Sequence, residues 1–188
     1  MTRSPMRWSV LGVVLWAGAG CSPVSMAGRA IKEIRGATSH IQEVPGTVTG
    51  RFDRYEGVKI TPIRSELDGL VSEKFTSTLP AAMRKYLIEE KDAPFQGGSP
   101  ALTIEPQVQW YHEASGAGKL LGSDSYAVVL FKLSADGAAL GKLQVATKEA
   151  AATAGRKAMA KSMAKKLAHW FTKRRKAQRE GKATEAAD

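Results

Sequence analysis

The sequence is short of the residues that form disulfides and metal centres. Its 188 residues include one cysteine, which excludes an intrachain disulfide and a metal site made of cysteines. The three histidines are His40, His112 and His169, and no two of them have the spacing of metal ligands. We therefore predict no metal and no cofactor. The serines occur in no G-x-S-x-G motif, so the sequence offers no nucleophile elbow either.

A phosphate-binding loop is also missing, although one segment is similar to it. The run Gly116-Ala117-Gly118-Lys119 has the last glycine and the lysine of that motif. Glu113 stands where the motif needs Gly, and Leu120 stands where it needs the hydroxyl that binds magnesium. We interpret the segment as a flexible hairpin loop. This leaves open that Leu120 and Leu121 contact a partner.

Acidic residues are scarce in the last part of the chain. Residues 151–188 have eleven Lys or Arg and three Asp or Glu, whereas residues 21–150 have fifteen of each kind. The formal net charge of +10 therefore comes mainly from the C-terminal segment. We expect the cluster Lys173-Arg174-Arg175-Lys176 to contact an anionic surface. The alternative is a solvated helix end, because cations are favoured near a helix C-terminus.

No apolar run reaches the roughly 20 residues that a membrane-spanning helix needs. The run Trp8–Ala17 has ten residues, follows Arg3 and Arg7, and is followed by the small residues 18–20. This order is typical of an export signal. Cys21 comes next, and the whole resembles a bacterial lipobox, in which the cysteine thiol receives diacylglycerol. It departs from that motif at position 18, where Gly replaces the usual Leu.

We therefore predict that residues 1–20 are a lipoprotein signal peptide and that Cys21 carries diacylglycerol and palmitate. The alternative is a plain signal peptide followed by a free thiol. Ser22 stands where Asp would resemble an inner-membrane retention signal. We accordingly expect a lipid-anchored protein of the bacterial cell envelope, at the outer membrane and facing the periplasm. In that compartment we expect no nucleic-acid partner.

The mature chain is predicted to begin with a tether and to continue into one domain. Residues 21–50 are mixed in composition, so we interpret them as the lipidated N-terminus and an irregular tether, with a short strand near Thr47–Thr49. Gly57–Ile63 then reads as a strand that ends at Pro62. A helix is predicted to begin at Ser65, its N-cap, because apolar residues recur from there at steps of three and four. Pro80 should kink or divide that helix.

Three strands and a second helix follow. Leu102–Trp110 alternates apolar and polar residues, although Pro106 places it at an edge or a bulge. Ser125–Leu133 is apolar on both faces and should be the central strand, with Val129 and Phe131 facing the helices. Ala135-Asp136-Gly137 is a turn signal that pairs this strand with Leu140–Thr147. Residues 151–176 are rich in Ala, Lys and Arg, which favour a helix.

The predicted fold is α+β, with a small, mostly antiparallel sheet of about four strands and two long helices packed on one face. We place this domain in residues 51–172 and treat residues 173–188 as a basic polar tail. Three segments resemble a lipoprotein-associated bacterial domain of unknown function: Arg54-Tyr55-Glu56-Gly57-Val58, Gly98-Ser99-Pro100-Ala101-Leu102 and Gly122-Ser123-Asp124-Ser125-Tyr126. That resemblance implies an envelope lipoprotein and transfers no catalytic residue.

Two functional classes remain for such a protein. The first is a lipid-anchored module that binds or scaffolds another envelope component, either a protein or an anionic polymer. The second is a hydrolase that acts on an envelope polymer, because a pair of carboxylates can form in space without a motif in the sequence. A binding module needs an exposed sheet edge or apolar patch, whereas a hydrolase needs a pocket with titratable groups.

Overall fold

A computed structural model describes residues 37–67, 69–115, 117–118, 123–149 and 156–181. The predicted signal peptide, Cys21 and the first part of the predicted tether lie outside these residues. No helix in the described part of the chain combines the length and the apolar character needed to cross a membrane.

The described chain forms one six-stranded sheet of order β1-β6-β5-β4-β2, with β3 paired to β4. All pairs are antiparallel except that β2 and β3 run parallel to β4. The strands are β1 Ala37–Glu43, β2 Gly57–Ile60, β3 Arg64–Ser65, β4 Ala101–His112, β5 Ser125–Ala135 and β6 Ala138–Glu149.

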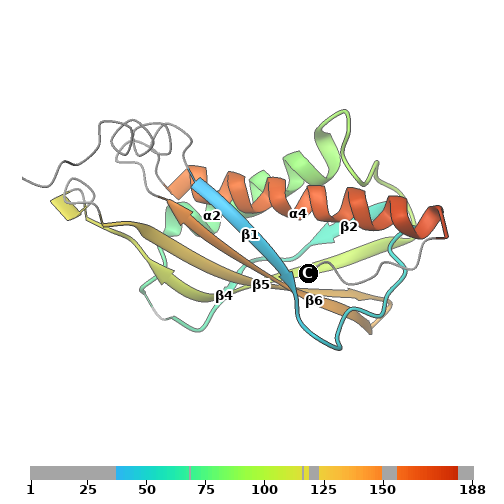
Figure 1. Ribbon diagram of the computed structural model, residues 1–188, viewed down its shortest axis with the longest axis horizontal. Helices are drawn as coiled ribbons and strands as arrows, with labels where there is room; N and C mark the ends of the chain where they lie inside the picture. The colour runs from blue at the N-terminus through green and yellow to red at the C-terminus, as the bar shows by residue number, and fades with distance from the viewer. Residues whose placement is uncertain (1–36, 68, 116, 119–122, 150–155, 182–188) are drawn as a thin grey trace, which may run out of the picture.

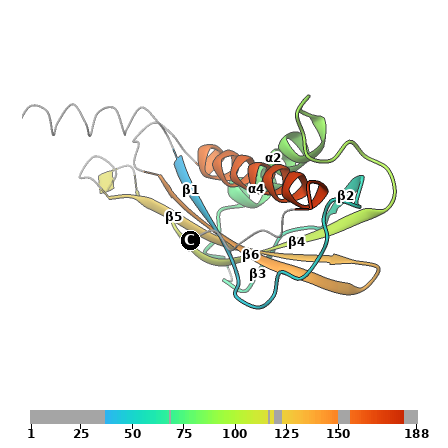
Figure 2. The same ribbon diagram turned by 45° about the vertical axis from the view of Figure 1, so that its right-hand side comes forward.

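Two helices cover one face of this sheet. The first is α2 (Glu73–Arg84), which continues into one π-helical turn, η1 (Lys85–Glu89), and the second is α4 (Arg156–Arg179). Both views of the ribbon place α2 and α4 side by side on the same side of the strands (Figure 1, Figure 2). The predicted α+β class is confirmed, and the other face of the sheet has no covering helix among the described residues.

The β5–β6 hairpin is the centre of the fold. Along β5, buried residues alternate with half-buried ones, as expected for a strand with one face on the core. Asp136 and Gly137 both have positive φ (49° and 80°), which is the backbone of the two-residue turns that favour Asp-Gly. The predicted turn and strand pairing are therefore confirmed.

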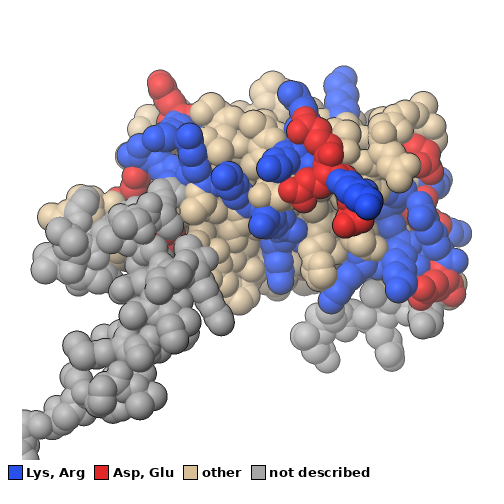
Figure 3. All heavy atoms as spheres, turned by 90° about the horizontal axis from the view of Figure 1, so that it is seen from above, with Lys and Arg blue, Asp and Glu red and all other residues tan. Residues whose placement is uncertain are grey.

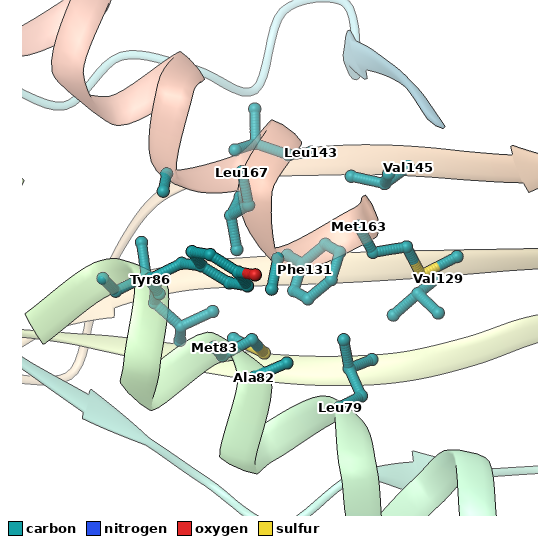
Figure 4. Packing of buried hydrophobic residues seen from close by; sticks show 14 of the residues in the cluster. Leu79, Ala82, Met83, Tyr86, Val129, Phe131, Leu143, Val145, Met163 and Leu167 are labelled. Atoms are coloured by element: carbon teal, nitrogen blue, oxygen red, sulfur yellow. The ribbon is translucent and has the colours of Figure 1, made fainter. Parts of the chain in front are cut away.

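The core lies between this hairpin and the helices, as Figure 4 shows at close range. Phe131 is fully buried, and Val129 beside it is fully buried as well, as predicted for side chains that face the helices. The helices contribute Leu79 and Met83 from α2 and Met163 from α4. These residues belong to a single cluster, so both helices and the sheet share one core.

The sheet has six strands, whereas we predicted about four. The strands that the prediction missed, β1 and β3, lie at or near the edges of the sheet. β1 lies in residues 21–50, which we predicted as an irregular tether. Its sequence ATSHIQE is short and mostly polar, because one side of an edge strand meets solvent. β3 has two residues and no hydrophobic signal at all. The domain therefore begins by Ala37, earlier than the predicted residue 51.

The first helix begins at Glu73, after Ser72, and not at the predicted N-cap Ser65. Ser65 instead belongs to β3, where its hydroxyl accepts a hydrogen bond from the backbone N–H of Leu67 at 3.1 Å. Such local bonds compete with helix formation, which accounts for the delayed start. Pro80 lies inside α2, which continues past it to Arg84 rather than dividing.

β4 differs from the prediction at two residues. Pro106 lies in an interior strand. The carbonyl of Ile104 accepts a hydrogen bond from the N–H of Thr61, so the backbone of Pro106, two residues further on, faces the same side of β4. β2 pairs with β4 up to Ile104 and β3 only from Gln107, so Pro106 faces the gap between them and no ladder bond is lost. A register shift between Val108 and Trp110 turns the strand, and Tyr111 takes the buried place that we predicted for Trp110. Trp110 is 61% exposed on the open face of the sheet.

We expect Phe131→Ala to lower the free energy of unfolding by about 3–5 kcal/mol, because the side chain is fully buried in the shared core. Urea denaturation, monitored by circular dichroism, measures this difference in unfolding free energy. Leu70→Ala is the control, since Leu70 is 70% exposed and its truncation should change stability by no more than about 0.5 kcal/mol. Equal stability losses in the two variants would contradict the assigned core.

Candidate binding groove between the edge strand and the basic helix

Helix α4 has ten Lys or Arg residues and no Asp or Glu. Ala, Lys and Arg are strong helix formers, so the segment is helical even though its apolar stripe is narrow. That stripe is buried against the sheet and α2; its large members are Met159, Met163, Leu167 and Phe171. Because the stripe occupies the inner side, most of the cations must lie on the outer side of the helix.

The outer side of α4 is a ridge of exposed cations. Its members are Lys157, Lys161, Lys165, Lys173, Lys176 and Arg179. Figure 3, which looks down on the helix layer, shows lysine and arginine side chains spread across this face, with acidic side chains at a few places. Lys176 lies 3.8 Å from the carboxylate of Glu180, whereas Lys161, Lys165 and Lys173 make no ion pair with another described residue.

A groove runs between α4 and β1, the strand at the edge of the sheet. It consists of two cavities of about 380 and 540 Å³, which share Ile41, Glu43 and Trp170. The smaller cavity is lined on the α4 side by Lys166, His169, Lys173, Arg174 and Ala177. The larger one follows the chain beyond β1 and is lined by Gln42, Val44, Pro45, Gly46 and Val48. We call this combined space the edge groove.

Glu43 is held in place within the edge groove. Its Oε1 accepts a hydrogen bond from the indole Nε1 of Trp170 at 3.1 Å and lies 3.5 Å from the guanidinium Nη1 of Arg174. The ring of Trp170 also packs edge-on against Phe52 and Phe171, so the indole is fixed from the core side. The groove thus has a rigid aromatic wall and one carboxylate that already has a hydrogen-bond donor and an ion-pair partner.

A hydroxyl cluster fixes β1 to α4 at its other end. The Ser39 hydroxyl lies 2.6 Å from the Thr147 hydroxyl of β6, and it donates to the Ser162 hydroxyl of α4 at 2.8 Å. Ser39, Ile41 and Glu43 therefore have their side chains on the α4 side of β1, while His40 and Gln42 between them are exposed. The edge groove is bounded by a strand that is held at both ends.

The structure divides the four cations that we predicted as one anionic-surface contact. α4 continues through all of them to Arg179, so the predicted polar tail from residue 173 onward is helical as far as that residue. Lys173 is exposed and lines the edge groove, and Arg174 lines it with 17% of its side chain exposed. Lys176 is exposed on the ridge, but Arg175 is only 6% exposed and faces the interior.

Arg175 is therefore a structural residue, which corrects its assignment to a surface contact. Its Nη2 donates a hydrogen bond of 2.7 Å to the backbone carbonyl of Tyr55, and its guanidinium carbon lies 4.8 Å from the centre of the Phe95 ring. Burial, followed by the nearby charge of Arg179, lowers the pKa of Arg175 from its ordinary value. Helical periodicity explains the difference, since four consecutive residues of a helix cannot share one face.

The remaining candidates from the sequence form no reactive cluster. His40 and His112 are exposed, and His169 lines the edge groove on its own. Among the described residues, no group of three or more His, Cys, Asp or Glu side chains is arranged to hold a metal ion. Burial and the neighbouring charge of Glu113 raise the pKa of Tyr111 to about 12, so this phenol stays protonated at neutral pH.

Sequence reasoning missed the residues that make the edge groove. Ile41 and Glu43 belong to a strand that we had assigned to the tether, and Trp170 lies in a segment for which we predicted a helix, without a binding role for this residue. Trp170 was the available signal, because an aromatic residue with a polar indole tends to lie where an apolar wall meets solvent.

Comparisons with known proteins identify no family. No family model and no curated protein matches the chain. Two solved structures of the PelC dodecamer from Paraburkholderia phytofirmans are similar, one of them of a point variant. The variant structure has 13% sequence identity and a TM-score of 0.44 and matches 72% of this chain and 98% of that chain. The other has 11% identity and a TM-score of 0.43, with 69% and 95% covered.

We expect Arg175→Ala to destabilise the fold and Lys176→Ala to leave it nearly unchanged. The first substitution removes a charged hydrogen bond to a buried carbonyl and should cost about 2 kcal/mol, or more where packing is also lost. The second removes an exposed pair with Glu180, which is worth about 0.5 kcal/mol or less. Chemical denaturation of both variants tests this, and similar losses would contradict the structural role of Arg175.

Proposed function

We propose that this chain is a lipid-anchored protein of the bacterial envelope that holds an anionic envelope component against the outer side of α4. The observation that carries the proposal is the charge of this helix, which has ten cations and no acidic residue. A solvated helix of ordinary composition mixes both signs on its exposed face. A helix face with an excess of one sign attracts the opposite sign and raises its local concentration.

The lipid predicted on Cys21 would support this function because it would hold the domain close to the membrane. An anchored domain meets other envelope components at high effective concentration, so a weak electrostatic contact is sufficient. A single acyl chain binds a membrane only marginally, which is why lipoprotein anchors need two or more. The anchor and the ridge would then have separate tasks, with the anchor supplying the location and the ridge supplying the attraction.

The geometry of the edge groove favours binding over hydrolysis. A glycosidase needs a pair of carboxyl groups separated by about 5–9.5 Å, and Glu43 is the one carboxylate among the described residues that line this groove. That carboxylate is already bound by Trp170 and Arg174, which leaves it a poor general base. A hydrolase that acts on an envelope polymer remains the alternative, and it would require a different cavity.

We expect the triple variant Lys161→Gln, Lys165→Gln, Lys173→Gln to bind a polyanion about 10- to 100-fold more weakly than wild type at low salt, because each cation near an anionic surface contributes about 1 kcal/mol. The measurement uses the full chain in neutral-detergent micelles, with fluorescent dextran sulfate as the probe and uncharged dextran as the blank. Wild-type binding should weaken as salt rises.

The matched control is Lys59→Gln, Lys132→Gln, Lys142→Gln, which removes the same charge from strands β2, β5 and β6. This control should bind the polyanion within about twofold of wild type, because none of its sites lies on α4. Equal weakening of both triple variants would mean that net charge alone governs binding and that α4 forms no specific surface.

The predicted anchor has its own test. We expect Cys21→Ala to move the protein out of the membrane fraction or to leave its precursor unprocessed, since the thiol is the acceptor of the lipid. Intact-mass measurement of the native protein should show a chain that begins at Cys21 and carries acyl groups. An unmodified cysteine in that spectrum would rule out the anchor, while Cys21→Ser should behave as Cys21→Ala does.

A further inference from the structure

We infer that the edge groove binds an extended, acidic segment of a partner protein, which adds to β1 as a further strand of the sheet. This inference rests on the proposed function, since it names the class of anionic partner. β1 is the last strand of the sheet, and among the described residues it has a strand neighbour, β6, on one side only. Its other side presents backbone groups that can pair with an incoming chain.

The register shows which backbone groups are free to pair. The N–H of Val44 donates to the carbonyl of Lys142 at 2.9 Å, so this pair is hydrogen-bonded. Hydrogen-bonded and non-bonded pairs alternate along an antiparallel ladder, and Gln42 and His40 therefore direct their backbone toward β6. Ile41, between them, directs its N–H and C=O away from β6, toward the open edge of the sheet.

The described strand β1 lacks three of the usual protections of an edge strand. Natural sheets shield their edges with Lys, Pro or a bulge. The strand ATSHIQE has neither Lys nor Pro, and its register with β6 is continuous over all seven residues. An edge that is regular, uncharged over most of its length and held at both ends is preorganised for a partner strand.

Charge and apolar surface define the partner. An added strand would direct alternate side chains toward α4, where they meet Ile41 and Trp170 in the wall of the groove. The same side chains come near Lys166 and Lys173, which make no ion pair with another described residue. A segment that alternates acidic or apolar residues with polar ones satisfies both features, whereas a lipid headgroup or a glycan would leave the strand edge unused.

The test uses the full chain in neutral-detergent micelles with a synthetic peptide of four Glu-Val repeats, and a peptide of four Lys-Val repeats as its control. At low salt we expect the acidic peptide to bind and the basic control peptide not to bind. It should slow amide hydrogen exchange in residues 37–43, because backbone N–H groups at the strand edge become paired. Protection confined to α4, or equal binding of both peptides, would overturn the inference.

Two substitutions at one position distinguish the contribution of the backbone to peptide binding from that of the side chain. Ile41→Pro removes the N–H that points away from β6 at the sheet edge without removing a bond to β6, whereas Ile41→Ala removes only the side chain. We expect the proline variant to bind the acidic peptide at least about tenfold more weakly than the alanine variant. It loses one backbone hydrogen bond to the peptide, and the proline ring obstructs the peptide backbone. Equal affinities would overturn the inference.

A charge-reversal pair covers the case in which Ile41→Pro fails to fold. Lys166→Glu with Lys173→Glu should abolish protection of residues 37–43 by the acidic peptide, and unchanged protection would overturn the inference. Dextran sulfate distinguishes the two proposals. If the wild-type chain binds dextran sulfate but not the peptide, the strand inference fails and the proposed function stands; if it binds neither, both fail.

Discussion

The packing of α4 is the constraint on which the other surfaces depend. Its apolar stripe must be buried against the β5–β6 hairpin, because among the described residues nothing else covers that part of the inner face of the sheet. Once Met163 and Leu167 are inside, helical periodicity confines most of the ten cations to the outer arc. The charged ridge and the hydrophobic core are thus two consequences of one orientation, and a rotation of the helix would lose both together.

The same orientation explains why Arg175 is buried at a tolerable cost. A guanidinium on the inner arc must be desolvated, and an unpaired buried charge would be strongly unfavourable. Arg175 instead donates to the carbonyl of Tyr55 and stacks over Phe95, in a part of the core that Phe52 and Phe171 also help to build. The side chain joins the end of α4 to the chain that leads into β2, so one arginine of the basic cluster contributes to the fold while its neighbours remain on the surface.

The central elements could be predicted from the sequence because their signals are local. The apolar run Ser125–Leu133 and the turn signal at Asp136-Gly137 specify a hairpin from adjacent residues. The edge elements could not, since β1 owes its place to pairing with residues more than a hundred positions away, such as Ser39 with Thr147. The bulge that exposes Trp110 left no mark in the alternation, and the cluster 173–176 showed its charge but not its division between two faces.

Weak contacts on two surfaces can act together if the chain is anchored as predicted. The sixteen residues from Cys21 to 36 limit the reach of the domain to about 55 Å from the lipid, so a partner in the same membrane layer is sampled repeatedly. Attraction by the ridge is long-ranged but unspecific and falls with salt. Backbone pairing at β1 would be short-ranged and would need an extended segment whose charge is opposite to that of the lysines in the groove. Under the two proposals, the ridge would favour encounter and the edge groove would supply selection, so neither contact would need to be strong alone.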